Sequence, residues 1–332
     1  MGPDTANAKP HERLSRALAD DMQAVNDLIA ARMSSQHAPR IPEVSAHLIG
    51  AGGKRVRPML TLASARLCGY GGPHHVALAA TVEFIHTATL LHDDVVDESA
   101  QRRGRPTANL LWDNKSSVLV GDYLFARSFQ LMVETGNLRV LSILSNAAAT
   151  IAEGEVLQLT AAQDLATGPD TYLKIVRGKT AALFAAATEV GGVIAGQPAQ
   201  VVDALRDYGD ALGVAFQMVD DLLDWSDSGT IGKNVGDDFR ERKLTLPLIH
   251  AIAVADPGER AFWERTIARG QQEKGDLDHA RRLLQDHGAL DRVRDEALGW
   301  AASAKAALTA APAHDLRDML ADLADYVVQR IS

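Results

Sequence analysis

Two groups of aspartates are the residues in this chain best suited to chemistry. The first group, Asp93, Asp94 and Asp97, occurs in LLHDDVVDES at the end of a long apolar segment. On a helix, Asp93 and Asp97 would lie one turn apart on the same face, where like charges repel each other. Apolar surroundings add a desolvation penalty for the ionised carboxylates. A divalent cation would offset both effects, and hard carboxylate oxygens are ligands that suit Mg²⁺.

The second group repeats the spacing of the first. Asp220, Asp221 and Asp224 occur in FQMVDDLLDW, again between apolar residues. One acidic motif alone could be a solvated helix end, but two unrelated surface patches would seldom share both the spacing and the apolar flanks. The two motifs together therefore predict facing carboxylate clusters around metal ions.

Basic residues accompany both aspartate motifs. In GGKRVRP, Lys54 and Arg57 follow a glycine pair that lets the backbone approach an anion closely, and together they could bind phosphate without metal. A basic loop at a helix start is the alternative interpretation of this segment. Further cations and a hydroxyl follow at Arg102, Arg103, Lys179, Thr180, Lys233 and Lys243. These charges would suit two diphosphates, one bridged to the aspartates by magnesium and one bound directly by lysine and arginine.

The composition argues against several classes of protein. The formal net charge of −9 disfavours a nucleic-acid-binding protein, since phosphate backbones select basic surfaces. The single cysteine, Cys68, allows no intrachain disulfide and fits a reducing compartment. The N-terminal residues lack the apolar core of a signal peptide, and no uninterrupted apolar stretch approaches the roughly 20 residues of a membrane span. We therefore expect a cytoplasmic protein with no membrane span.

Helices must position the aspartates, because apolar residues recur at spacings of three and four along most of the chain. The nearly uninterrupted apolar segment 76–92 is expected to be a buried helix that carries the first motif. Glycine- and proline-containing breaks separate it from further predicted helices over 116–133, 138–159, 171–193, 201–225 and 244–254 and within 277–330. We find no convincing alternating strand pattern. The chain is thus predicted to be all-α, with residues 11–332 as a single helical domain around the site and residues 1–10 disordered.

Six segments, in their order along the chain, resemble the motifs of the trans-isoprenyl (polyprenyl) diphosphate synthases. These segments are GGKRVRP, LLHDDVVDESAQRRGRPT, GDYLFARSF, GKTAALF, FQMVDDLLDW and GKNVGDDFRERKLTLP. The similarity extends from about Leu48 to Ala251 and is strongest to the bacterial octaprenyl-type, long-chain members. It implies the isoprenoid synthase fold, a helical bundle with a central cavity, usually as a homodimer. It also implies head-to-tail condensation of isopentenyl diphosphate with an allylic diphosphate, with about three Mg²⁺ ions per active site.

The resemblance assigns roles by position. It implies metal ligands at Asp93, Asp97, Asp220 and Asp224, with Asp94 and Asp221 in support. It implies that isopentenyl diphosphate is bound by Lys54, Arg57, His86 and Arg103. It implies that the allylic diphosphate contacts Arg102, Lys179, Thr180, Gln217, Lys233 and Lys243. The last motif commonly has glycine before its lysine, and this chain departs from that pattern with Arg242.

The same resemblance implies a mechanism without a protein base. Magnesium withdraws charge from the allylic diphosphate as its C–O bond breaks, and a dry apolar cavity protects the allylic cation from water. The double bond of isopentenyl diphosphate attacks that cation, and the departing diphosphate accepts the proton whose loss restores an alkene. Thr180 and Gln217 would therefore orient and stabilise the reacting groups, and we find no local signature of a nucleophilic triad.

Product length is predicted from the residues that precede the first aspartate motif. Ala88 and Thr89 lie one turn before it and Ile85 one turn further, where bulky aromatics form the cavity floor in short-chain members of the family. Small residues leave room beneath the metal site, so we expect an octaprenyl-type product of roughly C40–C50. Such a product would be a quinone side chain, made from a primer such as farnesyl diphosphate. We expect its release through peripheral membrane contact. Small residues that merely permit close helix packing are the alternative, and a deeper floor could come from Phe129 or Met132.

Three other functions compete with this prediction. A shorter-chain farnesyl or geranylgeranyl synthase would have a higher cavity floor. A terpene cyclase or head-to-head synthase usually replaces the second DDxxD motif and lacks the GGKRxRP segment, whereas both are present here. A non-catalytic subunit of a heteromeric prenyl synthase would have lost aspartate motifs, and both motifs are intact.

Overall fold

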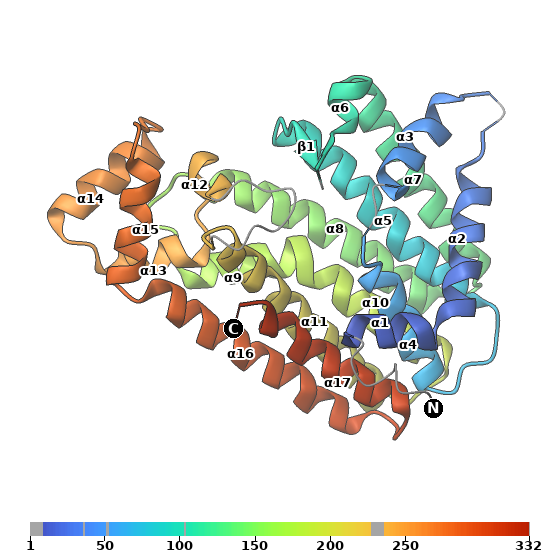
Figure 1. Cartoon of the computed structure of the whole chain (residues 1–332). Helices are drawn as coiled ribbons and strands as arrows, with labels where there is room; N and C mark the ends of the chain where they lie inside the picture. Colours follow the sequence, from blue (N-terminus) through green and yellow to red (C-terminus); the bar gives the residue numbers. More distant parts are fainter. Residues whose placement is uncertain (1–8, 36, 51–52, 103, 227–235, 332) are drawn as a thin grey trace.

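Helices make up nearly all of the described structure, a computed structural model that covers residues 9–331 except 36, 51–52, 103 and 227–235 (Figure 1). The α-helices are α1 (Pro10–Ala17), α2 (Ala19–Met33), α3 (Arg40–Gly50), α4 (Val56–Leu67), α5 (His74–Val96), α6 (Ala108–Leu111), α7 (Asn114–Glu134), α8 (Leu138–Ala161), α9 (Pro169–Val176), α10 (Ala182–Ile194), α11 (Ala199–Leu223), α12 (Asp237–Arg240), α13 (Leu246–Val254), α14 (Pro257–Trp263), α15 (Asp276–Asp286), α16 (Ala289–Ala307) and α17 (Asp315–Val328). Short π-helices are η2 (Arg177–Ala181) and η3 (Glu264–Ala268), and short 3-10 helices are η4 (Leu308–Ala310) and η5 (Gln329–Ile331). The all-α prediction is confirmed.

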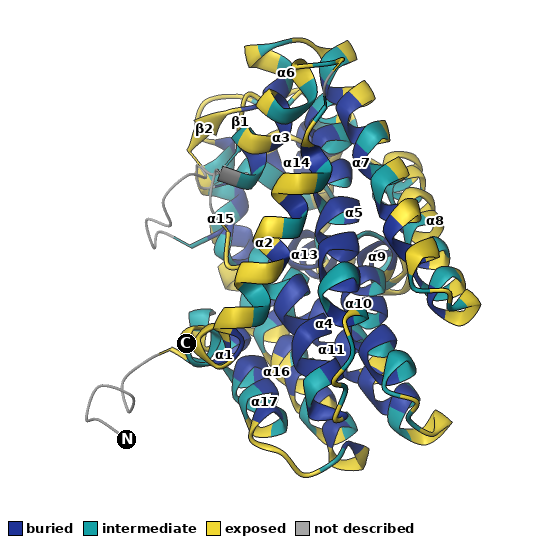
Figure 2. Cartoon of the chain, turned by 90° about the vertical axis from the view of Figure 1, so that its right-hand side faces the viewer, coloured by how far each residue is buried: buried dark blue, intermediate teal, exposed yellow. Residues whose placement is uncertain are grey.

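The centre of the bundle is formed by α4, α5, α10 and α11, whose buried faces are prominent in Figure 2. α5 packs against α7, α4 and α10, and α11 packs against α10 and α16. α5 is apolar on almost every side, with Leu78, Phe84 and Ile85 fully buried, as expected for a helix enclosed by others. Because the rest of α5 is fixed in the core, its carboxyl end holds the first aspartate motif in a defined position.

A second hydrophobic cluster lies beside the main core. It is built around Trp225, Phe239 and Trp263 and joins the end of the second aspartate motif to α12–α15. Figure 1 shows α12, α13, α14 and α15 gathered at one side of the molecule. From there α16 runs along α11, and α17 packs against α16, α11, α4 and α1. The C-terminal helices therefore support both the second motif and the N-terminal part of the bundle.

Three local features differ from the expected helices. The predicted helix 171–193 is interrupted by η2, which contains Lys179 and Thr180. A two-residue antiparallel pair, β1 (Gln101–Arg102) with β2 (Arg105–Pro106), follows the first motif. α1 already begins at Pro10, while residues 1–8 of the predicted disordered segment lie outside the described part of the chain.

An apolar surface extends over α6, α7 and α8. Among the described helices, α8 alone is long and apolar enough to cross a membrane by length and composition, with a mean hydropathy of 1.3 and 28% of its window buried. One such helix is weak evidence for a membrane span. The α6–α8 apolar surface consists of exposed Leu110, Leu111, Val118, Leu119, Phe129, Val133, Leu138, Val156 and Leu159. Exposed apolar side chains gathered on helices that contact one another mark interaction sites.

Candidate active site

The first aspartate motif lies at the carboxyl end of α5. Asp94 is fully buried, and its Oδ1 accepts a hydrogen bond of 2.8 Å from Nε of Arg102, which lies on β1, and forms an ion pair with Nη2 at 2.8 Å. Burial raises the pKa of Asp94 despite these bonds. Asp97 caps the helix, and its Oδ2 lies 3.1 Å from Nζ of Lys243. Cations of the chain thus contact two of the three carboxylates.

Asp93 has an unusually weak acidity for an aspartate. Burial, reinforced by the carboxylates of Glu155 and Asp97, raises the pKa of Asp93 to about 7, although Lys179 and Arg102 oppose the change. The ionised form of Asp93 is therefore disfavoured until further positive charge comes near it.

The carboxylates of the second motif have different partners. Oδ1 of Asp220 lies 3.3 Å from Nη1 of Arg330 in η5. Asp224 is only 3% exposed, and its two oxygens accept the backbone N–H groups of Asp237 (3.2 Å) and Asp238 (3.1 Å) at the start of α12. These bonds give Asp224 a capping role in the fold, and its role as a metal ligand stays a prediction.

A chain of hydrogen bonds links the second motif to η2. Thr180 donates its hydroxyl proton to Oε1 of Gln217 (2.8 Å), and Nε2 of Gln217 donates to Oδ1 of Asp221 (2.8 Å). The other oxygen of Asp221 accepts the buried hydroxyl of Tyr172 at 2.6 Å. Burial and the adjacent Asp221 carboxylate raise the pKa of Tyr172 well above its ordinary value, so this hydroxyl remains a donor. Tyr172 and Asp221 thereby fix the amide orientation of Gln217.

Lys179 owes its position to a close contact between two helices. Its Nζ lies 2.7 Å from a carboxylate oxygen of Glu155 on α8. A Cβ on Gly154 would lie 2.7 Å from the backbone nitrogen of Lys179, and a Cβ on Gly178 would lie 2.8 Å from Cα of Gly154. Only glycines allow this approach. Sequence reasoning missed Glu155 as well as Tyr172; the available signal was Gly154 beside a carboxylate in AEGEVLQ, within an apolar helix.

Two of the predicted isopentenyl diphosphate ligands lie together. Nη1 of Arg57 is 3.2 Å from Nε2 of His86, and the Arg57 guanidinium lies 4.5 Å above the Phe184 ring, a favourable cation–π distance. Arg55, between the two predicted ligands of GGKRVRP, instead contacts Glu83 at 2.7 Å. Arg55 therefore anchors the segment, while Arg57, which carries the positive charge, and His86 form a hydrogen-bonded pair.

The remaining predicted cations are less closely grouped. Lys54 is exposed, and its Nζ lies 3.4 Å from Oη and 5.1 Å from the ring centre of Tyr326 on α17. Arg103 and Lys233 lie outside the described residues. Lys54 thus contacts the C-terminal helix α17, a contact that the sequence did not suggest.

The residues predicted to set product length lie within α5. Ile85 and Ala88 are fully buried, and Thr89 is half-buried with its hydroxyl donating to the carbonyl oxygen of His86 (2.8 Å). Of the deeper candidates, Met132 is buried, whereas Phe129 is 42% exposed on the outside of α7. Phe129 therefore does not form a cavity floor within the chain.

The carboxylates fit a magnesium ion that binds together with a phosphate ligand. Asp93, Asp97 and Asp220 supply hard oxygen donors, and the raised pKa of Asp93 reports a site that favours added positive charge. Within the described residues, no three histidine, cysteine or acidic side chains are close enough to hold a metal by themselves. Mg²⁺ usually takes only one or two carboxylates, with water and substrate phosphates completing its shell. The donor set agrees with that mode of binding.

Known proteins share this sequence and this fold. The family model described as polyprenyl synthetase matches residues 38–284. The octaprenyl diphosphate synthase of Escherichia coli (strain K12) is 43% identical over 320 residues, covering 96% of this chain and 98% of the relative. The crystal structure of a decaprenyl diphosphate synthase from Rhodobacter capsulatus is 72% identical, with a TM-score of 0.95 and coverage of 97% and 99%. A polyprenyl synthase from Caulobacter crescentus CB15, complexed with calcium and isoprenyl diphosphate, is 54% identical, with a TM-score of 0.92 and coverage of 97% and 98%.

The chain belongs to the polyprenyl synthetase family. It is a prenyltransferase, and the expected isoprenoid synthase fold and long-chain, all-trans class of polyprenyl synthase are confirmed. This family uses a divalent metal to bind diphosphate, which agrees with the carboxylates described above.

Proposed function

We propose that this prenyltransferase adds isopentenyl diphosphate repeatedly to an allylic primer such as farnesyl diphosphate. The product would contain eight to ten isoprene units, the range spanned by the octaprenyl and decaprenyl synthases to which the chain is similar. It would serve as the side chain of a quinone such as ubiquinone. The observation that carries the proposal is the presence of two carboxylate motifs with two separate cationic groups, Lys179 near Asp93 and Arg57 with His86.

The carboxylates and nearby cations suit a diphosphate with its metal. Asp93, Asp97 and Asp220 would hold about three Mg²⁺ ions, which when bound draw charge from the leaving diphosphate. Lys243 and Arg330 bring positive charge to Asp97 and Asp220. A thermal-shift titration tests this arrangement: we expect little stabilisation by Mg²⁺ alone and a large shift with Mg²⁺ plus inorganic pyrophosphate. An equal shift with Mg²⁺ alone would contradict it.

The hydrogen-bond network supports different roles for Lys179 and Thr180. Lys179 carries the charge that an allylic diphosphate requires. Thr180 uses its only proton in the bond to Gln217, so towards a substrate it can act only as an acceptor. That arrangement favours contact of Thr180 with a developing allylic cation over the predicted contact with a diphosphate oxygen. Arg57, whose guanidinium lies over the Phe184 ring, presents a planar group that suits bidentate binding of the second diphosphate.

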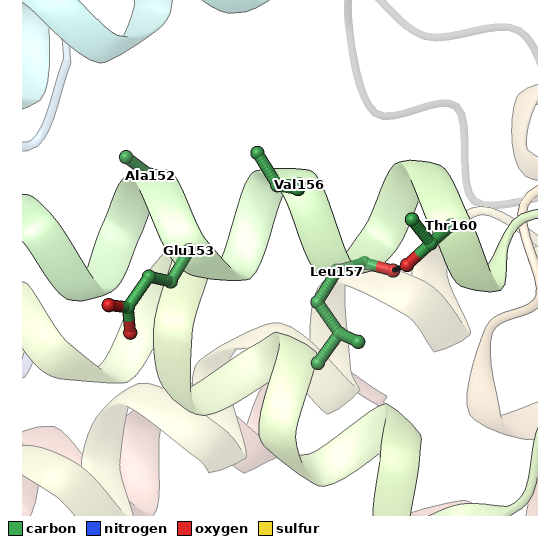
Figure 3. A pocket seen from close by; sticks show the side chains of 5 residues that line it. All are labelled: Ala152, Glu153, Val156, Leu157 and Thr160. Carbon is green, nitrogen blue, oxygen red and sulfur yellow. Dashed lines mark hydrogen bonds between the residues drawn. The ribbon is translucent and has the colours of Figure 1, made fainter.

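A homodimer would cover the α6–α8 apolar surface. Two hollows lie on this surface: one of about 460 Å³ is lined by Ala152, Glu153, Val156, Leu157 and Thr160 of α8 (Figure 3), and one of about 380 Å³ is lined by Asn114, Lys115, Val118 and Leu119 of α7. Ala152 and Val156 project from the same side of α8 (Figure 3), and Val156 is 61% exposed. A subunit interface explains the apolar character of α8 without a membrane span. A cytoplasmic location and peripheral membrane contact for product release remain predictions.

Sedimentation of the Val156→Lys variant tests the dimer. We expect the wild-type chain to sediment as a dimer and the variant to shift towards monomer. An unchanged dimer would place the interface elsewhere. The control is Arg294→Glu, at a part-exposed position of α16, which should leave the association unchanged.

Product analysis tests the activity itself. The purified chain is incubated with farnesyl diphosphate, isopentenyl diphosphate and Mg²⁺, and the dephosphorylated alcohols are separated by chromatography. We expect products of roughly C40–C50, the length that small residues above a cavity would permit. Products of farnesyl or geranylgeranyl length would indicate a short-chain synthase. Turnover of allylic diphosphate alone would indicate a cyclase, and no turnover by the isolated chain would indicate a non-catalytic subunit.

A further inference from the structure

The segment that delivers Lys243 to the first motif is a short turn, residues 236–243, which we name the α12 turn. One side of it is held by the second motif: the N–H of Gly236 donates to the backbone oxygen of Asp224 (2.8 Å), and the Asp224 carboxylate caps α12. At its other end, Nζ of Lys243 lies 3.1 Å from Asp97 and contacts Glu241 at 2.6 Å. The α12 turn therefore connects the two aspartate motifs.

The other side of the α12 turn lies against residues 264–277, which we name the supporting segment. Nε2 of Gln272 donates to the carbonyl oxygen of Phe239 (2.7 Å). A Cβ on Gly236 would lie 2.3 Å from Cδ1 of Leu277, so the Leu277 side chain packs directly on that glycine. These two contacts fix the beginning and the middle of the turn.

Arg242 makes the third contact, at the end of the turn. A Cβ on Gly270 would lie 2.6 Å from Nη1 and 3.0 Å from Cζ of Arg242, so the guanidinium covers the Cα of Gly270. Gly270 has a φ of +67°, in the left-handed region that favours glycine. The backbone conformation of this position favours glycine, and Arg242 fills the space that a Cβ would enter.

The supporting segment is itself firmly braced. Arg265 donates to both carboxylate oxygens of Asp276 at 2.8 Å and to the carbonyl oxygen of Gln271 at 2.7 Å. Asp276 also accepts the N–H of Glu273 at 2.7 Å. Planar, bidentate arginine–carboxylate pairs hold both partners in one orientation. Arg242 therefore rests on a part of the chain with little freedom to move.

Arg242 also occupies a backbone conformation that arginine rarely adopts. Its φ is +58°, in the left-handed region, which explains why glycine would fit this position best. Backbone hydrogen bonds at the end of α12 hold this conformation, from the N–H of Arg242 to the carbonyl oxygen of Phe239 (3.1 Å) and from the N–H of Lys243 to that of Asp238 (2.9 Å). The side-chain contact with Gly270 adds to them, and it lies one residue from Lys243.

We propose that Arg242 is a positioning residue for Lys243, holding the lysine towards Asp97 by resting on the Gly270 turn of the supporting segment. This inference rests on the proposed role of Lys243 as a ligand of the allylic diphosphate. Burial alone would lower the pKa of Lys243, but the Asp97 and Glu241 carboxylates raise it above its ordinary value. The ammonium group therefore stays charged, and its placement rather than its protonation depends on Arg242.

Steady-state kinetics test the proposal with the variants Arg242→Ala, Arg242→Gly, Lys243→Ala and the double variant of Arg242 and Lys243 to alanine. We expect both Arg242 variants to raise the KM for the allylic diphosphate about tenfold, as for a coupled neighbour, with the KM for isopentenyl diphosphate and the thermal midpoint unchanged. Equal effects of alanine and glycine would show that the higher KM for the allylic diphosphate comes from the missing side chain and not from a changed backbone conformation. The double variant should be no worse than Lys243→Ala alone. The control is Arg240→Ala, on the same turn, which removes only an exposed pair with Asp237 (2.8 Å).

Additive effects of the two alanine substitutions, or an Arg242→Ala variant that behaves like Arg240→Ala, would overturn the proposal. A second measurement does not depend on activity: the coupling between Asp97→Asn and Lys243→Met in urea denaturation should be lost in the Arg242→Ala background. Retention of that coupling would also overturn the proposal. If the coupling is lost but Lys243→Ala leaves the allylic KM unchanged, Arg242 positions Lys243 as inferred and the assigned substrate role of Lys243 is what fails.

Discussion

Asp93→Asn should make the metal-free protein more stable at high pH while abolishing activity. In the unfolded chain Asp93 has an ordinary pKa of 3.8, whereas in the fold burial and the Glu155 and Asp97 carboxylates raise it to about 7. The stability linked to the neutral form is complete below the unfolded pKa and is lost as pH rises through the folded pKa. Above about pH 7 the native protein must hold an ionised, poorly solvated Asp93.

The size of this effect follows from the pKa difference. Raising the pKa from 3.8 to about 7 corresponds to an upper limit of about 4 kcal/mol. Solvent at the half-buried carboxyl reduces that figure, so we expect the stability difference between variant and wild type to widen by about 2 kcal/mol between mildly acidic and mildly alkaline pH. Asparagine resembles the neutral carboxyl group, so the variant does not lose stability through ionisation as the pH rises.

Urea denaturation in the presence of a chelator measures this difference. Wild type and Asp93→Asn are unfolded at about pH 5 and about pH 8, on either side of the native pKa. Asp318→Asn, at an exposed position of α17, is the control and should show no pH-dependent gain. The same stability difference between wild type and Asp93→Asn at both pH values would refute the reasoning, because the carboxyl would then have an ordinary acidity in the fold.

Three further predictions concern the rest of the site. Ala88→Tyr should shorten the main product on chromatography of the dephosphorylated alcohols, because it fills the space predicted beneath the first motif, and an unchanged length would contradict that reasoning. Tyr172→Phe should lower the free energy of unfolding by about 1–3 kcal/mol, since Asp221 loses a buried donor; urea denaturation with no change would show that water replaces the hydroxyl. Arg330→Gln should lower, by roughly two- to tenfold, the Mg²⁺ concentration needed for half-maximal thermal stabilisation with pyrophosphate, because one cation no longer competes for Asp220; an equal or higher requirement would argue against competition.

The helices and the motifs they carry could be predicted from the sequence. The apolar segment 76–92 lies within α5, and the predicted segment 138–159 lies within α8. Such long periodic segments have few alternatives, because only burial in a helical bundle satisfies both their apolar faces and their backbone groups. The acidic and basic residues of the motifs were equally informative, because the chemistry of a carboxylate or a cation follows from the residue type itself.

Contacts between distant parts of the chain could not be predicted in this way. Lys243 meets Asp97, and Arg330 meets Asp220, across more than a hundred residues in each case. Periodicity reports which face of one helix is buried and contains nothing about which other element packs there. The capping role of Asp224 was hidden for the same reason, because its partners belong to a turn with no periodic pattern.

The number of residues in η2 is constrained as strictly as their types. A π-helical turn holds one residue more than the α-helical turn it replaces, and η2 carries both Lys179 and Thr180. Deleting one residue between Arg177 and Ala181 would give a more regular helix, but it would rotate one flank against the other by about 100°. Lys179 could then no longer face Glu155 while Thr180 faces Gln217. Evolution of this enzyme can therefore shorten η2 no more easily than it can replace Lys179 or Thr180.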